Sequence, residues 1–157
     1  MKMTISIYHD FQVFHNITGV LNKIDFENFS PHEKGIYSHN IKPYLVPNPF
    51  ILNGIKFSSP CCLFTTYDIN KDHSFLHLEK NGIIDFPSIT NGVLLEFESL
   101  LNSLIQVTSI NEETITTSIY TNHNHALLGF MSPNGIKRIE FVESPTFISS
   151  MLFTVCS

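Results

Sequence analysis

Two histidines one residue apart, His123 and His125, are the arrangement in this sequence with the clearest capacity for chemistry. In an extended chain, residues at positions i and i+2 project from the same face. Two imidazoles on one face can bind zinc, copper or nickel when further ligands come from elsewhere in the fold. The surrounding Asn and His residues are also typical of a solvated turn between strands, and we favour this simpler interpretation.

Asp25 and Glu27 also occupy alternate positions, in a segment with a strand-like pattern. Carboxylate oxygens are the hard ligands that calcium prefers, so this pair is the candidate metal site and Ca²⁺ the candidate cofactor. The alternative is the solvated side of an amphipathic strand. A second acidic segment, Asp68, Asn70 and Asp72, has the spacing of a calcium loop. It lacks the turn glycine and the closing Glu of such a loop, which favours a polar loop instead.

The aromatic residues suggest a surface for a sugar. A pyranose ring stacks on an exposed aromatic side chain while its hydroxyls bond to nearby polar groups. The chain has fourteen Phe and five Tyr but no Trp. Tyr67 and Tyr120 fall near expected strand ends, so we predict that Tyr67, Tyr120, His123 and His125 bind ligand.

The sequence predicts no catalytic residues. It contains neither a Gly-x-Ser-x-Gly elbow nor a glycine-rich phosphate loop. Cys61 and Cys62 lie in an apolar setting, and we interpret them, with Cys156, as small buried hydrophobic residues.

Short segments that alternate between apolar and polar residues must position these side chains. The clearest are residues 24–27 and 93–98, where buried and acidic positions follow one another. Further segments rich in Ile, Phe, Thr, Val and Tyr are typical of strands; they are residues 4–8, 50–57, 63–67, 75–78, 83–86, 104–110, 114–121, 126–131, 136–142 and 146–155.

Turn-forming residues separate these segments. They are Asn48-Pro49, Asn53-Gly54, Asn81-Gly82, Asn91-Gly92 and Pro133-Asn134-Gly135. Asn81-Gly82 predicts a hairpin between residues 75–78 and 83–86. Three prolines make residues 36–50 an edge or a long connection. Residues 93–107 also satisfy a helical spacing, which leaves room for at most one short helix.

We therefore expect residues 1–157 to form a single all-β domain, a two-sheet antiparallel β-sandwich. The net charge of −5 and the scattered basic residues argue against nucleic acid as a partner. The first residues do not have the pattern of a secretory signal, and the apolar stretches fall short of the roughly 20 residues that span a bilayer.

Three stretches together resemble the jelly-roll sandwiches of bacterial exported proteins that carry a PEP-CTERM sorting tail. They are IDFENF at residues 24–29, FILNGIKFSSP at residues 50–60, and the run from TTSIYTNHNHALLGFMSPNGIKRIEF to FISSMLFTV. The resemblance implies a jelly roll related to carbohydrate-binding and galactose-binding-like modules, with calcium tying the first strand to the last. It also implies export. The sequence departs from the pattern at Ser149 and Ser150, where the family has an Asp.

The function that follows from this resemblance is a non-catalytic module that binds a glycan, another surface ligand or a small molecule. A second hypothesis is a small isomerase or cyclase with an apolar pocket between the sheets. A third is a structural subunit that forms homo-oligomers through its β edges.

Overall fold

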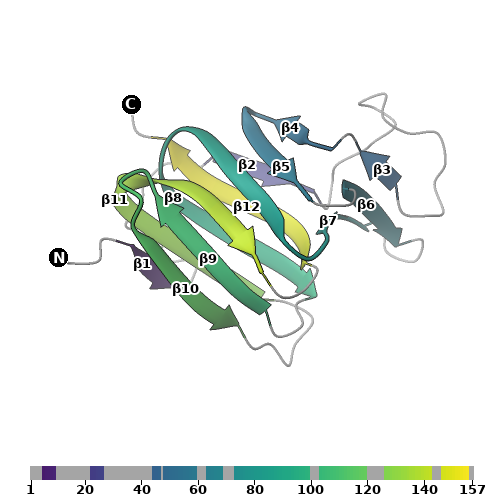
Figure 1. Ribbon diagram of the computed structural model, residues 1–157. Helices are drawn as coiled ribbons and strands as arrows, with labels where there is room; N and C mark the ends of the chain where they lie inside the picture. Colours follow the sequence, from purple (N-terminus) through teal and green to yellow (C-terminus); the bar gives the residue numbers. More distant parts are fainter. Residues whose placement is uncertain are drawn as a thin grey trace.

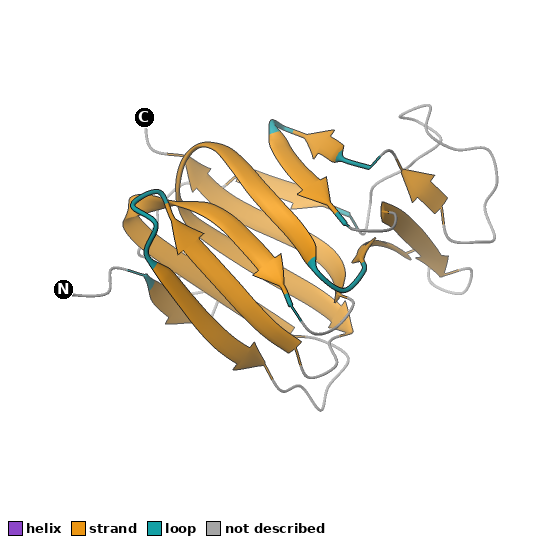
Figure 2. Ribbon diagram, in the orientation of Figure 1, coloured by secondary structure: helices purple, strands orange, loops and turns teal. Residues whose placement is uncertain are grey.

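The computed structural model describes residues 5–9, 22–26, 44–46, 48–59, 63–68, 73–99, 103–119, 126–142 and 146–155. Within these ranges the protein consists of β-strands joined by turns, and no helix is present (Figure 2). The strands are β1 (Ser6–Tyr8), β2 (Asn22–Asp25), β3 (Tyr44–Val46), β4 (Phe50–Leu52), β5 (Ile55–Ser58), β6 (Leu63–Asp68), β7 (His73–Leu78), β8 (Gly82–Ser99), β9 (Ser103–Ser109), β10 (Thr114–Ile119), β11 (Ala126–Phe141) and β12 (Thr146–Val155). The all-β prediction is confirmed.

These strands form one antiparallel sheet with the order β10-β9-β11-β8-β12-β7-β6-β3. Three shorter strands extend it: β1 pairs with β11, β2 pairs with β12, and β5 pairs with both β8 and β4. The predicted edge within residues 36–50 is confirmed, because β3 lies at one end of the order.

The sheet curls because its two longest strands, β8 and β11, bend together. They pair along both halves, but the register shifts between Met131 and Ile136 and again between Ile136 and Arg138. One half of β8 pairs with β12, and the other half pairs with β5. In the same way, β11 pairs with β1 in its first half and with β9 in its second. The two halves of the sheet thereby turn toward each other (Figure 1).

Two of the predicted turns lie at the bends of β8 and β11 and do not reverse the chain. Gly92 lies inside β8, paired with Met131 and with Thr154. Pro133 and Gly135 lie inside β11, where Gly135 has a φ of 96°. Gly and Pro within a long strand weaken regular pairing and favour bulges, so the prediction of turns at Asn91-Gly92 and at Pro133-Asn134-Gly135 was wrong.

The turn at Asn53-Gly54 is confirmed as the connection of the β4–β5 hairpin. Both residues have positive φ, 52° and 80°, which suits the tight two-residue turn. Asn48 closes the open end of this hairpin: its Nδ2 donates to the Ser59 carbonyl oxygen at 2.7 Å, and its Oδ1 accepts from the Ser59 N–H at 3.2 Å.

The predicted hairpin at Asn81-Gly82 is wrong, although the turn itself forms. Asn81 has a φ of 67°, and the Gly82 N–H donates to the Glu79 carbonyl oxygen. The Asn81 N–H, however, donates to the carbonyl oxygen of Phe141. This bond joins the start of β8 to β11. Strand β7 pairs with β6 and β12, so β7 and β8 do not form a hairpin.

The helical alternative for residues 93–107 is wrong in the described part of that segment. Residues 93–99 belong to β8, and residues 103–107 belong to β9. Val93, Leu95 and Phe97 belong to the core cluster, whereas Leu94, which is also buried, does not. The alternation with period two, set by burial of one face, therefore prevails over the helical spacing.

The core lies inside the curl of the sheet. Its largest fully buried side chains are phenylalanines, and they are Phe26, Phe57, Phe97, Phe130 and Phe141. Phe97 and Phe141 come from opposite halves of the curl and meet edge to face at 6.1 Å. Phe26 and Phe57 do the same at 5.5 Å. Contacts of this kind join the two halves of the sheet through one core.

The described part of the chain contains no helix long and apolar enough to cross a membrane, in keeping with the sequence-based expectation.

Candidate functional site

A row of polar side chains crosses three neighbouring strands. Strand β12 lies between β2 and β8, and Ser150 pairs with Asp25 on one side and with Glu96 on the other. Directly opposed residues of antiparallel strands share a face of the sheet. Asp25, Ser150 and Glu96 therefore lie on one face, which we call the carboxylate row, with Ser150 in the middle.

A bulge in β12 shapes this row. Ile148 pairs with Phe97 and Ser150 pairs with Glu96, so Ser149 is one extra residue on β12. The Ser149 hydroxyl donates to the Glu96 carbonyl oxygen at 3.1 Å, and the Ser150 hydroxyl donates to Glu96 Oε2 at 2.8 Å. Both serines are buried, at 1% and 3% exposed. The Ser150 hydroxyl thus holds the Glu96 carboxylate and the Ser149 hydroxyl holds the Glu96 backbone, while the Glu96 side chain stays half-buried.

Asp25 stands at the other end of the carboxylate row, where β2 ends. Its side chain is 29% exposed, and its Oδ2 lies 3.9 Å from Nζ of Lys23. An ion pair of this length at a surface contributes little to stability. Asp25 and Glu96 thus present two carboxylates at the surface on either side of buried Ser150.

His77 lies beside the same strand β12. Strand β7 pairs with residues 146–148 of β12 and β2 with residues 150–153, so the two short strands follow each other along one side of it. The His77 ring stacks on Phe147, its cross-strand partner, at 4.4 Å. Its Nε2 is 3.5 Å from Glu79 Oε1. Burial lowers the pKa of His77, and the charge of Glu79 opposes this effect in part.

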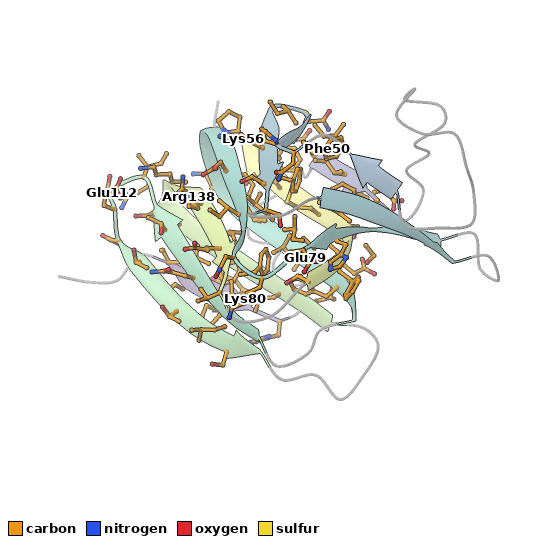
Figure 3. The ribbon with its side chains drawn as sticks, turned by 45° about the vertical axis from the view of Figure 1, so that its right-hand side comes forward. Phe50, Lys56, Glu79, Lys80, Glu112 and Arg138 are labelled. Carbon is orange, nitrogen blue, oxygen red and sulfur yellow. The ribbon has the colours of Figure 1, made fainter. Side chains whose placement is uncertain are left out.

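Several connections between strands meet the sheet near the starts of β11 and β12. The turn from β7 to β8 carries Glu79 and Lys80, which are labelled in Figure 3. Residues 120–125 connect β10 to β11, and their described neighbour Ala126 pairs with Phe97, next to Glu96. Residues 143–145 lead into Thr146, which pairs with Leu78. The carboxylate row therefore lies where the chain repeatedly passes between the two halves of the sheet.

The other half of the sheet carries ion pairs on its outer face. Lys56, Asp85 and Arg138 form a row across β5, β8 and β11, of which Figure 3 labels Lys56 and Arg138. Arg138 Nε donates to Asp85 Oδ1 at 2.7 Å, and this bond raises the pKa of Arg138. Lys137 Nζ donates to Glu112 Oε1, also at 2.7 Å, between exposed side chains. This half of the sheet thus pairs Arg138 with Asp85 and Lys137 with Glu112.

Of the predicted site residues, Asp25 is the one whose side chain the structure describes. Tyr120, His123, His125 and Glu27 lie outside the described residues, as do the three cysteines. Tyr67 belongs to β6, where its backbone pairs with Ser74. In the sheet order, β7 lies between β6 and β12.

No group of three or more His, Cys, Asp or Glu side chains within the described ranges is arranged to hold a metal ion. The cross-strand neighbour of Asp25 is Ser150, at the place where the resembled family has Asp. A calcium site at Asp25 and Glu27 stays a prediction.

Sequence reasoning missed Ser150 and Glu96 as cross-strand companions of Asp25, and His77 as a residue beside β12. The alternation marked Glu96 as a residue facing away from the core, but only the sheet order brings β2, β12 and β8 together. The pair Ser149-Ser150 in an otherwise apolar strand was the available signal, because buried hydroxyls need partners.

Comparison with models of known protein families finds no match, and comparison with curated protein sequences finds none either. The function is therefore argued from the geometry of the site.

Proposed function

We propose that the protein is a non-catalytic binding module that recognises a glycan or a similar hydroxyl-rich surface ligand at the carboxylate row. The observation that carries this proposal is the placement of Asp25 and Glu96 on either side of Ser150 on one face of the sheet. Carboxylates accept hydrogen bonds from sugar hydroxyls, and those bonds are stronger than bonds between neutral groups.

The organisation of the Glu96 side chain supports binding. The Ser150 hydroxyl donates to the Glu96 carboxylate, and the Ser149 hydroxyl donates to the Glu96 backbone carbonyl oxygen. A side chain already held in position loses little conformational entropy when it binds a ligand. Ala126, the first described residue after Tyr120, His123 and His125, pairs with Phe97 next to Glu96, and we propose that those three residues supply further ligand contacts.

Calcium enters the proposal as a bridging ion. Hard oxygen ligands from Asp25 and Glu27 would suit Ca²⁺, as the resemblance to calcium-containing sandwiches implies. We treat the ion as a variable of the binding experiment.

We further propose that the curled sheet is a jelly-roll sandwich. In this arrangement β10, β9, β5 and β4 form one layer with the second half of β11 and the first half of β8. Strands β1, β12 and β2 form the other layer with the first half of β11 and the second half of β8. The aromatic contacts Phe97–Phe141 and Phe26–Phe57, which cross between these halves, support two stacked layers.

A buried catalytic group is less well supported. Among the described residues, the one buried titratable side chain is that of His77. It alternates with Leu76 and Leu78 of the core, so it faces away from the core interior where an isomerase or cyclase would hold an apolar substrate.

The experiment is a glycan array probed with the wild-type chain under two conditions, one with calcium and one with a chelator. A second measurement compares the double variant Asp25→Asn, Glu96→Gln with the control Asp85→Asn, which removes a carboxylate from the other half of the sheet. We expect the double variant to bind at least about tenfold more weakly, equivalent to about 1.4 kcal/mol, and the control to bind like the wild type. An array without binding, or equal binding by both variants, would overturn the proposal.

A further inference from the structure

Among the described strands, β10 forms an edge of the sheet, and this edge lacks the usual protection. It is the first strand in the sheet order and pairs with β9 alone among the described strands (Figure 1). Natural sheets usually protect an edge with charged residues, proline, a bulge or a very short strand. The six residues Thr114–Ile119 contain neither a charge nor a proline.

The other short edge strands differ from β10. Strands β1, β3 and β4 have three residues each, and β2 carries Lys23 and Asp25. Strand β10 is therefore the longest uncharged edge in the described part of the sheet.

The hydrogen-bond pattern identifies the backbone groups that β10 presents at its free side. The Ser109 N–H donates to the Glu113 carbonyl oxygen at 2.8 Å, so this pair is a hydrogen-bonded pair of the ladder. Such pairs alternate along antiparallel strands, so Ile115 and Thr117 direct their N–H and C=O groups toward β9. Thr114, Thr116 and Ser118 direct theirs outward, and the side chains of these three residues are exposed.

We infer that this edge pairs with the same edge of a second copy of the chain. In an antiparallel arrangement about a two-fold axis at Thr116, the outward backbone groups meet their equivalents. Thr116 lies opposite Thr116, and Thr114 lies opposite Ser118. The exposed face then carries opposed hydroxyl side chains, which can hydrogen-bond to each other, and the core faces of both copies stay on the same side.

Charge favours this antiparallel arrangement. Glu112 and Glu113 precede β10. Antiparallel pairing about Thr116 separates the two Glu113 residues by about six residues of strand, or about 20 Å. This distance exceeds the screening length of about 8 Å at physiological ionic strength. In parallel pairing the same carboxylates would lie side by side, so repulsion disfavours it.

Three variants test this inference by light scattering after size exclusion, over a dilution series. The wild type is expected to elute as a dimer. Thr116→Pro removes an outward N–H and leaves the β9 ladder intact, so this variant is expected to elute as a monomer. Thr116→Lys brings two like charges together at the axis and weakens dimerisation at least about tenfold. Mixing Thr116→Lys with Thr116→Glu restores the dimer, because position 116 faces itself. Ser6→Lys, on the exposed edge strand β1, is the matched control and stays dimeric.

Amide hydrogen exchange provides a readout that does not depend on any variant. The amides of Thr116 and Ser118 exchange slowly in concentrated wild-type protein and rapidly on dilution, whereas those of Ile115 and Thr117 are protected in both. A wild type that is monomeric throughout, or a Thr116→Pro variant that folds and remains dimeric, overturns the inference.

Discussion

His77 illustrates how one residue can carry a pH dependence without belonging to the core. Its side chain is 11% exposed and its ring stacks on Phe147, while Glu79 lies at the edge of hydrogen-bond range. Burial disfavours the charged imidazolium, so the pKa of His77 in the folded protein is below its ordinary value.

The sign of the pH effect follows from this lowered pKa. As the pH falls below about 6.5, the ordinary His pKa, the unfolded chain takes up a proton at this position before the folded chain does. Stability contributed by neutral His77 is therefore present above pH 6.5 and is lost as the pH falls through the folded pKa. Urea denaturation of the wild type and of His77→Phe, at a series of pH values, measures the effect.

We expect the free energy of unfolding of the wild type to fall more steeply below pH 6.5 than that of His77→Phe. Phenylalanine keeps a ring against Phe147 but cannot titrate, and the other histidines contribute equally to both proteins. Parallel pH profiles for the two proteins would contradict this account of His77.

The serines of β12 mark the limit of residue-level prediction. The hydroxyls of Ser149 and Ser150 both donate to Glu96, which the order of residues in β12 does not predict. The sequence identifies both serines, but their partner is 53 residues or more away along the chain. Only the order of strands in the sheet brings the two together.

At the scale of elements, the β4–β5 hairpin depends on a side chain outside both strands. Asn48 makes two hydrogen bonds to the backbone of Ser59 and so joins the residues that flank the hairpin. At about 1 kcal/mol for each such bond, Asn48→Ala is expected to destabilise the protein by about 1–2 kcal/mol.

Chemical denaturation compares Asn48→Ala with Asn22→Ala, which changes an exposed Asn at the start of β2. The control is expected to stay within about 0.5 kcal/mol of the wild type. Equal stabilities for the two variants would show that the Asn48 hydrogen bonds do not stabilise the hairpin.

Strands were more predictable than their connections. Residues 146–155 were predicted as a strand and form β12 with the same bounds, because their Ile, Phe, Thr and Val side chains suit a pleated, packed surface. Asn91-Gly92 and Asn53-Gly54 look alike in sequence, yet one lies inside β8 and the other ends a strand. Gly permits both conformations, and the pairing partners decide between them.

At the scale of the whole molecule, the all-β class could be predicted, whereas the sheet order could not. Ser150 and Asp25 are far apart in sequence, and so are Phe97 and Phe141, so local patterns contain no information about either pair. The core explains why the curl forms: bending β8 and β11 allows one apolar face to cover itself, and burial of apolar surface is the main favourable contribution to folding.

The position of β12 between β2 and β8 is the feature on which the proposed site depends. Nuclear Overhauser contacts between backbone protons measure it directly in isotopically labelled protein. The account predicts cross-strand contacts from Ser150 to both Asp25 and Glu96, with strand-type contacts through residues 93–99. Absence of either cross-strand contact, or helical contacts between residues three apart in that segment, would contradict it.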